Sequence, residues 1–132
     1  MDKATQEFIV GYLAKAEQKL RVAEKLFKGG DWEDAVSRAY YAAFHAAQAL
    51  LLSEDLRADT HKGVVMLFGL HFVKTGKFNR KFAEHLTNLK DDREAGDYDA
   101  FTLINEQTAA NALHEAQEFV AEARQYLKAY LK

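Results

Sequence analysis

The stretch from Ser37 to Leu50, SRAYYAAFHAAQAL, constrains the fold more than any other part of the chain. Alanine dominates it, and neither glycine nor proline occurs between residues 31 and 53. Alanine has the highest helix propensity, whereas glycine and proline interrupt helices. The stretch therefore predicts one long helix, around which the rest of the chain must fold.

This predicted helix has two different faces. At about 100° per residue, Arg38 and His45 lie two turns apart and differ by only about 20° around the axis. Tyr41 and Gln48 fall on the same stripe, within about 80° of Arg38. The opposite side is apolar and consists of Trp32, Val36, Tyr40, Ala43, Phe44, Ala47, Leu50 and Leu51. The stripe is bordered by small side chains that would let another backbone approach closely, namely Ala42, Ala46 and Ala49. We therefore expect a core face and, behind it, a polar face prepared for a partner.

The composition favours helices throughout. The chain has 132 residues, the usual size of one domain, and contains no proline. Alanine, leucine, glutamate and lysine, which are good helix formers, are abundant. We predict a single domain over residues 1–132 with an all-α fold, an up-and-down bundle of four or five helices.

Several classes of site and location are disfavoured by composition. The absence of cysteine excludes disulfides, thiolate metal sites and a cysteine nucleophile, and it suits a reducing cytoplasm, where we expect the protein. Residues 1–7 are polar and precede no apolar run, which predicts no signal peptide. No stretch approaches the roughly 18 apolar residues of a membrane span. The formal charge of −2 and the pI near 6.2 argue against a surface that coats nucleic acid, but they allow a small basic site.

Turn and capping residues divide the chain into further helices. An apolar stripe predicts a first helix over about residues 4–27, which Gly29 and Gly30 end, one of them in a left-handed cap. Asp31 should cap the second helix, and short turns favour antiparallel neighbours. Three more helices are expected after it. The third has its N-cap at Asp59 or Thr60 and runs through Val73, and the fourth carries Phe78 and ends at Gly96. The last helix begins near Asn105.

The Arg38 and His45 pair, with six residues between its members, resembles the signature of the HEPN superfamily. That signature is an arginine and a histidine separated by four to six residues on a bundle's second helix. Further blocks are similar to those of a small, stand-alone prokaryotic HEPN group, namely HKGV at residues 61–64, HFVKTG at 71–76 and REAGDY at 93–98. The resemblance covers nearly the whole chain.

The resemblance implies a fold, an activity and partners. HEPN domains are up-and-down helical bundles that usually form homodimers, in which two Arg/His motifs share one composite cleft. Many are metal-independent endoribonucleases in toxin–antitoxin, antiphage and CRISPR systems. The stand-alone proteins are often encoded beside a minimal nucleotidyltransferase that neutralises them. We therefore expect a homodimer, RNA as substrate, a nucleotidyltransferase antitoxin as partner, and neither cofactor nor metal.

The residue types on the stripe suit this chemistry. RNA cleavage without metal needs a base for the 2′-hydroxyl proton, positive charge on the phosphate and an acid for the leaving 5′-oxygen. His45 is assigned to proton transfer and Arg38 to phosphate binding, since arginine stays charged and binds phosphate bidentately. Tyr41 can hydrogen-bond the phosphate or a ribose, and Gln48 is a substrate-binding candidate by position. A symmetric dimer would supply two histidines, one as base and one as acid.

Two further residues are candidates for substrate binding, each with a structural alternative. Arg93 can join the cleft, or it can hold the end of its helix through an ion pair with Asp97 while Tyr98 packs over the bundle, and the second interpretation is favoured. His61 can line a pocket, although a capping or surface role is favoured. The remaining histidines lack metal-ligand spacing, so no metal site is predicted.

Three hypotheses follow for the stripe. The first is a metal-independent endoribonuclease that acts through Arg38 and His45. The second is a non-catalytic module that binds a nucleotide or a nucleotidyltransferase partner through the same face. The third is a structural dimer in which Arg38 pairs with a carboxylate while His45 and Tyr41 bond across the axis. The intact Arg/His pair favours the enzyme, and the acidic pI favours the binding module.

Overall fold

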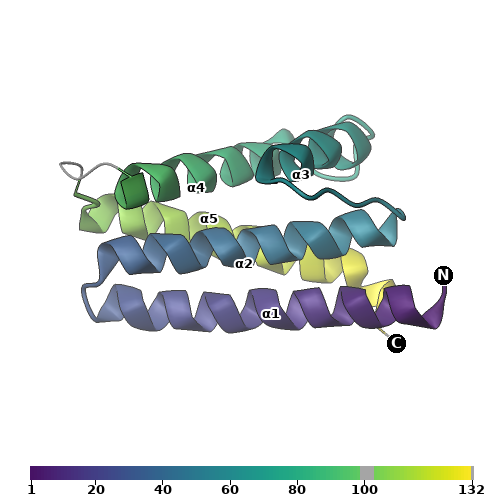
Figure 1. The fold of residues 1–132 in the computed structure, drawn as a ribbon, viewed down its shortest axis with the longest axis horizontal. Coiled ribbons are helices and arrows are strands. Elements are labelled where there is room, and N and C mark those ends of the chain that lie inside the picture. The colour runs from purple at the N-terminus through teal and green to yellow at the C-terminus, as the bar shows by residue number, and fades with distance from the viewer. Residues whose placement is uncertain (99–102, 132) are drawn as a thin grey trace.

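The computed structural model describes residues 1–98 and 103–131, and within them every regular element is helical (Figure 1). In chain order they are α1 (Lys3–Lys28), α2 (Trp32–Ser53), α3 (His61–Phe68), a π-helical turn η1 (Gly69–Val73), α4 (Arg80–Tyr98), α5 (Glu106–Leu127) and a 3-10 turn η2 (Lys128–Tyr130). The predicted all-α bundle is confirmed. None of the helices in these residues is long and apolar enough to cross a membrane.

Most helix ends lie where the capping residues predict them. Gly30 has φ of 81° and ends the first hairpin arm in the left-handed region that glycine tolerates. The side chains of Thr60 and Asn105 accept hydrogen bonds from the backbone N–H three residues on, at 3.0 and 2.9 Å. Asp31 occupies the N-cap of α2, but its side chain forms no capping hydrogen bond.

Gly96 does not end the fourth helix, so this prediction is wrong. α4 runs on to Tyr98, and Gly96 is buried within it. A Cβ atom there would lie 2.9 Å from Cγ of Glu33 and 3.2 Å from Cγ1 of Ile104. The glycine therefore allows α4 to pass close to α2 and to the segment before α5. Phe78 precedes α4 instead of beginning it, yet its side chain is buried.

α2 is the central helix of the bundle. Figure 1 shows α1 along one side of it, α3 and α4 along the other, and α5 behind. Between residues 35 and 53 nearly every side chain is buried, and the accessible ones are Ser37, Arg38, Tyr41, His45 and Gln48. The polar face predicted for this helix is thus its only accessible face over that range.

The small residues beside the stripe are packed within the chain itself. Ala42, Ala46 and Ala49 are each 0% exposed. α1 lies antiparallel to α2, as the contacts Phe27–Trp32 and Tyr12–His45 show. These alanines therefore pack against the chain's own neighbouring helices, and only the stripe itself stays accessible on this part of α2.

An aromatic cluster fastens α3 and η1 to the bundle. Phe68 is fully buried, and its ring lies 5.5 Å from Phe72, 5.3 Å from Phe78 and 5.4 Å from Phe119. The contact with Phe72 is stacked, that with Phe78 is edge-on and that with Phe119 is tilted, and such contacts add to the stabilisation that burial of each ring provides. The cluster therefore joins the end of α3 and η1 to α5 and to the segment before α4.

Candidate functional site

The polar stripe consists of Arg38, Tyr41, His45 and Gln48 on the outer face of α2. Arg38 is exposed and, among the residues that the structure describes, forms neither a hydrogen bond nor an ion pair. An unpaired guanidinium keeps all its N–H donors available for an anion. The structure thus presents a cation on the same face as His45, about 10 Å away along the helix axis, since each residue rises 1.5 Å.

His45 is held from both sides. Its Nδ1 lies 3.2 Å from Oε1 of Gln48, one turn further along α2. Because the amide oxygen only accepts, Nδ1–H donates, and Nε2 of the neutral ring carries the free lone pair. The Tyr12 ring of α1 stacks beside it, with ring centres 6.1 Å apart and an angle of 23°. The imidazole is therefore oriented, with Nε2 available to accept a proton.

The surroundings of His45 keep it neutral. Burial lowers the pKa of His45 below its usual 6.5, and the charges of Lys15 and Lys19 on α1 lower it further. The hydrogen bond to Gln48 opposes this shift. At neutral pH the imidazole is thus mainly in the form that acts as a base.

Tyr41 links the stripe to Arg93 of α4. The Arg93 guanidinium carbon lies 4.9 Å from the centre of the Tyr41 ring and 4.8 Å from that of Tyr40. These are cation–π distances. Nε of Arg93 also lies 3.2 Å from Oδ2 of Asp97, as the i,i+4 spacing predicts. Arg93 therefore forms the predicted ion pair with Asp97 and also contacts Tyr41 of the stripe. The Tyr98 side chain lies outside the described part of the structure.

His61 and Arg93 both contact Tyr40. The Tyr40 hydroxyl and Nδ1 of His61 share a hydrogen bond, and the His61 ring also packs on Phe44 with centres 4.8 Å apart. Burial, then the charges of Arg93 and Lys90, lower the pKa of His61. Burial raises the pKa of Tyr40 far above its usual range. Thr60 caps α3, so His61 does not; as the first residue of that helix His61 is exposed, which agrees with the favoured surface position.

The comparison with known families decides what this bundle is. The family model described as "HEPN domain" matches residues 10–126, which includes α2 and its whole polar stripe. The chain belongs to the HEPN family. Its Arg38–His45 pair lies on the central helix of a HEPN domain.

Individual HEPN relatives support the assignment. A Methanocaldococcus jannaschii protein named "Putative toxin" is 36% identical over 131 residues, covering 99% of this chain and 97% of its own. A second "Putative toxin" from that organism is 32% identical, covering 87% of this chain and 78% of its own. A solved structure from Thermus thermophilus shares the fold, with a TM-score of 0.76 at 22% identity, over 89% of this chain and 96% of that one.

Sequence reasoning missed the contribution of α1 to the surroundings of His45. Tyr12, Lys15 and Lys19 follow one another at intervals of three and four, so they share one helix face. That spacing is a signal, but α1 must be docked on α2 before it can point to His45. Periodicity places Tyr40 on the core face, where it is indeed buried, although its hydroxyl reaches His61.

Charge is distributed unevenly over the molecule. Basic groups act on the two site histidines, whereas a groove of about 580 Å³ between α4 and α5 is lined by Asp91, Asp92 and Glu115. His85 in that groove is tied to Glu115 at 3.2 Å and to Glu118 at 2.7 Å. No group of three metal-binding side chains is present in the described residues. Within a net charge of −2, Lys15 and Lys19 thus act on His45, while at His61 the charge of Glu94 opposes those of Arg93 and Lys90.

The protonation of His45 gives a direct test of this geometry. We expect NMR titration to show a pKa of His45 below 6.5, and the double change Lys15→Gln and Lys19→Gln to raise it, because two positive charges are removed. Because the pKa of His45 is lower in the folded wild type than in its unfolded chain, the unfolded chain binds more protons at slightly acidic pH. The free energy of unfolding should therefore fall as pH decreases below 6.5. The same changes at the exposed Lys3 and Lys25 are the control. An unchanged titration in the Lys15 and Lys19 variant would contradict the arrangement.

Proposed function

We propose that this HEPN protein is a toxin-type endoribonuclease that cleaves RNA without a metal ion through Arg38 and His45. The observation that carries the proposal is the accessible stripe of α2, with an unpaired arginine and an oriented, neutral histidine on which the charges of Lys15 and Lys19 act. The toxin names of the two relatives support the same class.

The proposed reaction uses each group of the stripe. Nε2 of His45 accepts the proton of the ribose 2′-hydroxyl, whose oxygen attacks the adjacent phosphorus. The P–O5′ bond breaks, leaving a 2′,3′-cyclic phosphate and a 5′-oxygen that must gain a proton. Arg38 binds the non-bridging oxygens, where negative charge accumulates in the transition state. Tyr41, held by Arg93, is placed to donate its hydroxyl to the phosphate or ribose.

The leaving 5′-oxygen requires an acid that one copy of the stripe does not supply. His45 has become protonated by the base step and is occupied at the other oxygen. We propose that a symmetric homodimer brings a second stripe into the same cleft and that its histidine donates this proton. The exposed outer face of α2 is the surface that such a dimer would share.

Removal of the Arg38 charge tests the proposal. In EDTA we expect the wild type to cut RNA and Arg38→Ala to cut it about 100- to 1,000-fold more slowly, the usual cost of one transition-state donor. Arg38→Lys should recover only part of the rate, because lysine cannot bind phosphate bidentately. Arg80→Ala, which removes an exposed arginine at the start of α4, is the matched control. Full activity of Arg38→Ala would overturn the proposal.

The binding alternative has one observation in its favour. An exposed, unpaired Arg38 is also what a nucleotide phosphate or an acidic partner surface would need. If the wild type leaves RNA intact while a nucleotide, or a minimal nucleotidyltransferase encoded beside it, binds in an Arg38-dependent way, the protein is a binding module. For the toxin we propose the same nucleotidyltransferase as the antitoxin that neutralises it.

A further inference from the structure

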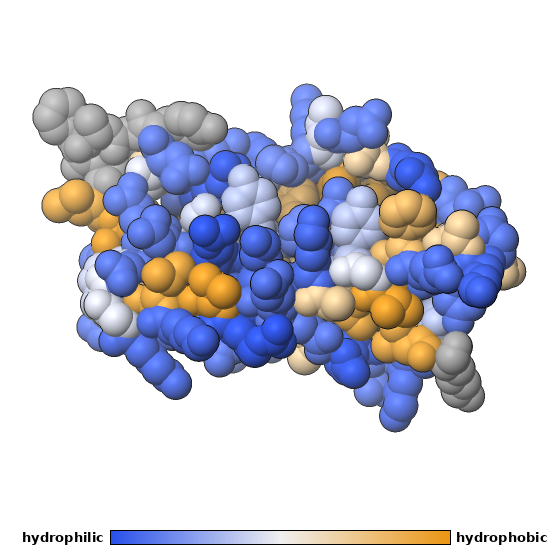
Figure 2. Space-filling model, turned by 60° about the horizontal axis from the view of Figure 1, so that its bottom comes forward, coloured by the Kyte–Doolittle hydropathy of each residue, from blue (hydrophilic) through white to orange (hydrophobic). Residues whose placement is uncertain are grey.

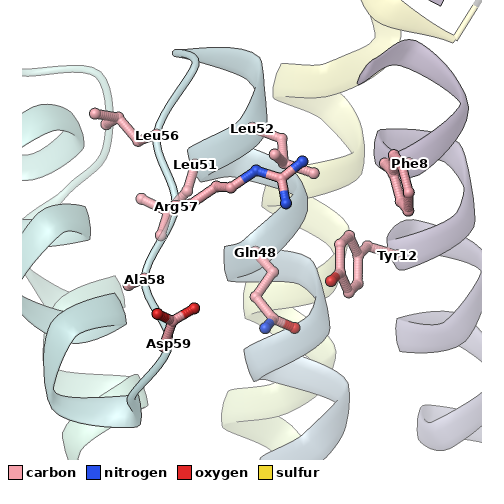
Figure 3. A pocket seen from close by; sticks show the side chains of 9 residues that line it. All are labelled: Phe8, Tyr12, Gln48, Leu51, Leu52, Leu56, Arg57, Ala58 and Asp59. Atoms are coloured by element: carbon pink, nitrogen blue, oxygen red, sulfur yellow. The ribbon is translucent and has the colours of Figure 1, made fainter. Parts of the chain in front are cut away.

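A pocket of about 260 Å³ opens beside the polar stripe, between α1, α2 and the linker that leads to α3 (Figure 3). Phe8 and Tyr12 form one wall, and Arg57 and Asp59 of the linker form the other. Leucine side chains of α2 and the linker supply apolar walls. Sites for drug-sized ligands measure about 300–1,000 Å³, so this pocket suits one ring system better than a whole nucleotide.

The pocket is continuous with the site of His45. Gln48 lines the pocket and also accepts the hydrogen bond from Nδ1 of His45. Tyr12 lines the pocket and stacks beside the same imidazole. In Figure 3 the Gln48 and Tyr12 side chains point toward one another at the side of the pocket. A nucleotide whose phosphate lay at His45 would thus have its neighbouring base within reach of the pocket.

The walls have the chemistry of base recognition. Phe8 is 54% exposed, and Arg57 reaches across the mouth with its guanidinium carbon 5.9 Å from the Phe8 ring centre (Figure 3). Unpaired RNA bases stack on aromatic rings and on arginine planes. Figure 2 shows that apolar side chains on the α1 side gather in separate patches with hydrophilic surface between them. Phe8 lines the pocket together with Leu52 and Leu56, so its exposed ring offers a stacking surface at an apolar wall.

We propose that this pocket holds the base next to the scissile phosphate and that it favours guanine. The inference rests on the proposed function, because His45 fixes where the phosphate lies. Asp59 presents a carboxylate that only accepts, and guanine alone carries two adjacent donors, N1–H and the 2-amino group, on its pairing edge. Arg57 donates to O6 and N7 of guanine, the commonest specific contact of arginine with a base. Phe8 and Tyr12 supply the stacking surface.

Binding of RNA that cannot be cleaved tests the pocket. The probes are 2′-O-methyl uridine hexanucleotides in which one position is guanosine, inosine, adenosine or cytidine, measured by fluorescence anisotropy. We expect the guanosine probe to bind the wild type about tenfold more tightly than the all-uridine probe, the low end of the discrimination that one bidentate base contact provides. Phe8→Ala should weaken the binding of every probe, because every base can stack, whereas Asp59→Asn should remove the guanosine advantage. The inosine probe lacks the 2-amino group that Asp59 would bind. It should therefore bind the wild type as weakly as the guanosine probe binds the Asp59→Asn protein.

Matched variants separate the pocket from general effects. Asp55→Asn removes an exposed carboxylate from the same linker, outside the pocket, and should keep the guanosine preference. Met66→Ala removes an exposed apolar side chain of α3 and should also keep it. Phe8 is more than half exposed, so its removal leaves the fold intact.

The outcomes distinguish this inference from the proposed function. If the wild type cleaves RNA but binds all probes equally, the proposed base pocket is wrong and the proposed function stands. If the wild type prefers the guanosine probe but cleaves no RNA, the proposed endoribonuclease activity is wrong and the base pocket stands. If Phe8→Ala changes the sedimentation mass, Phe8 lies between two copies of the chain, and the base pocket is wrong.

Discussion

The His45→Ala protein should fold as the wild type does and cleave RNA about 100- to 10,000-fold more slowly, the usual contribution of general acid–base catalysis. The loss is expected to be at the upper end, because in the proposed dimer each cleft takes both its base and its acid from this position. His45 is only half-buried on the accessible face of α2, so alanine there leaves the core unchanged. Cleavage of a fluorescent RNA in EDTA measures the rate, and circular dichroism confirms the fold.

A second histidine provides the control for that experiment. His114 is exposed on α5 and lines the acidic groove between α4 and α5. His114→Ala should retain full activity. If both variants keep the wild-type rate, His45 does not transfer the proton, whereas equal losses in both would indicate a contaminating or indirect effect.

The Phe68→Ala protein should lose about 3–5 kcal/mol of its free energy of unfolding, the cost of removing a buried aromatic side chain. Phe68 is 0% exposed and touches three other rings, so the cavity cannot close by a small shift. Since natural domains are stable by only about 5–15 kcal/mol, this change takes a large share of the total. Urea unfolding measures the loss through the midpoint at unchanged slope.

An exposed apolar residue on the neighbouring turn serves as the control for Phe68. Leu70 is 47% exposed, and Leu70→Ala should change the free energy of unfolding by no more than about 0.5 kcal/mol. A small loss in Phe68→Ala would show that the aromatic cluster does not hold α3 in place.

Local sequence rules were sufficient to predict the extent of α2 and the residues on its polar face. Its alanine content and the lack of glycine predict the helix, and a period of 3.6 residues places Arg38, Tyr41, His45 and Gln48 on one face. The structure leaves that face accessible while neighbouring helices cover the rest. Periodicity is a property of the helix itself, so it is readable before any tertiary contact is known.

Tertiary contacts explain what the sequence did not reveal. Gly96 has the local chemistry of a helix end, but the approach of Glu33 and Ile104 requires a residue without Cβ inside the helix. The placement of Lys15 and Lys19 beside His45 depends on how α1 docks, and that of Arg93 depends on α4. Spacing along one helix cannot determine which residues of another helix it meets.

The chemical identity of the RNA ends tests the central claim most directly. An RNA with a single cut site is digested in EDTA by the wild type, beside the same RNA with one 2′-deoxy nucleotide on the 5′ side of that cut. The account predicts a 2′,3′-cyclic phosphate and a 5′-hydroxyl from the first RNA, no cut in the second, and no cut of either by His45→Ala. Cleavage of the 2′-deoxy RNA at the same bond, or 5′-phosphate products, would contradict it.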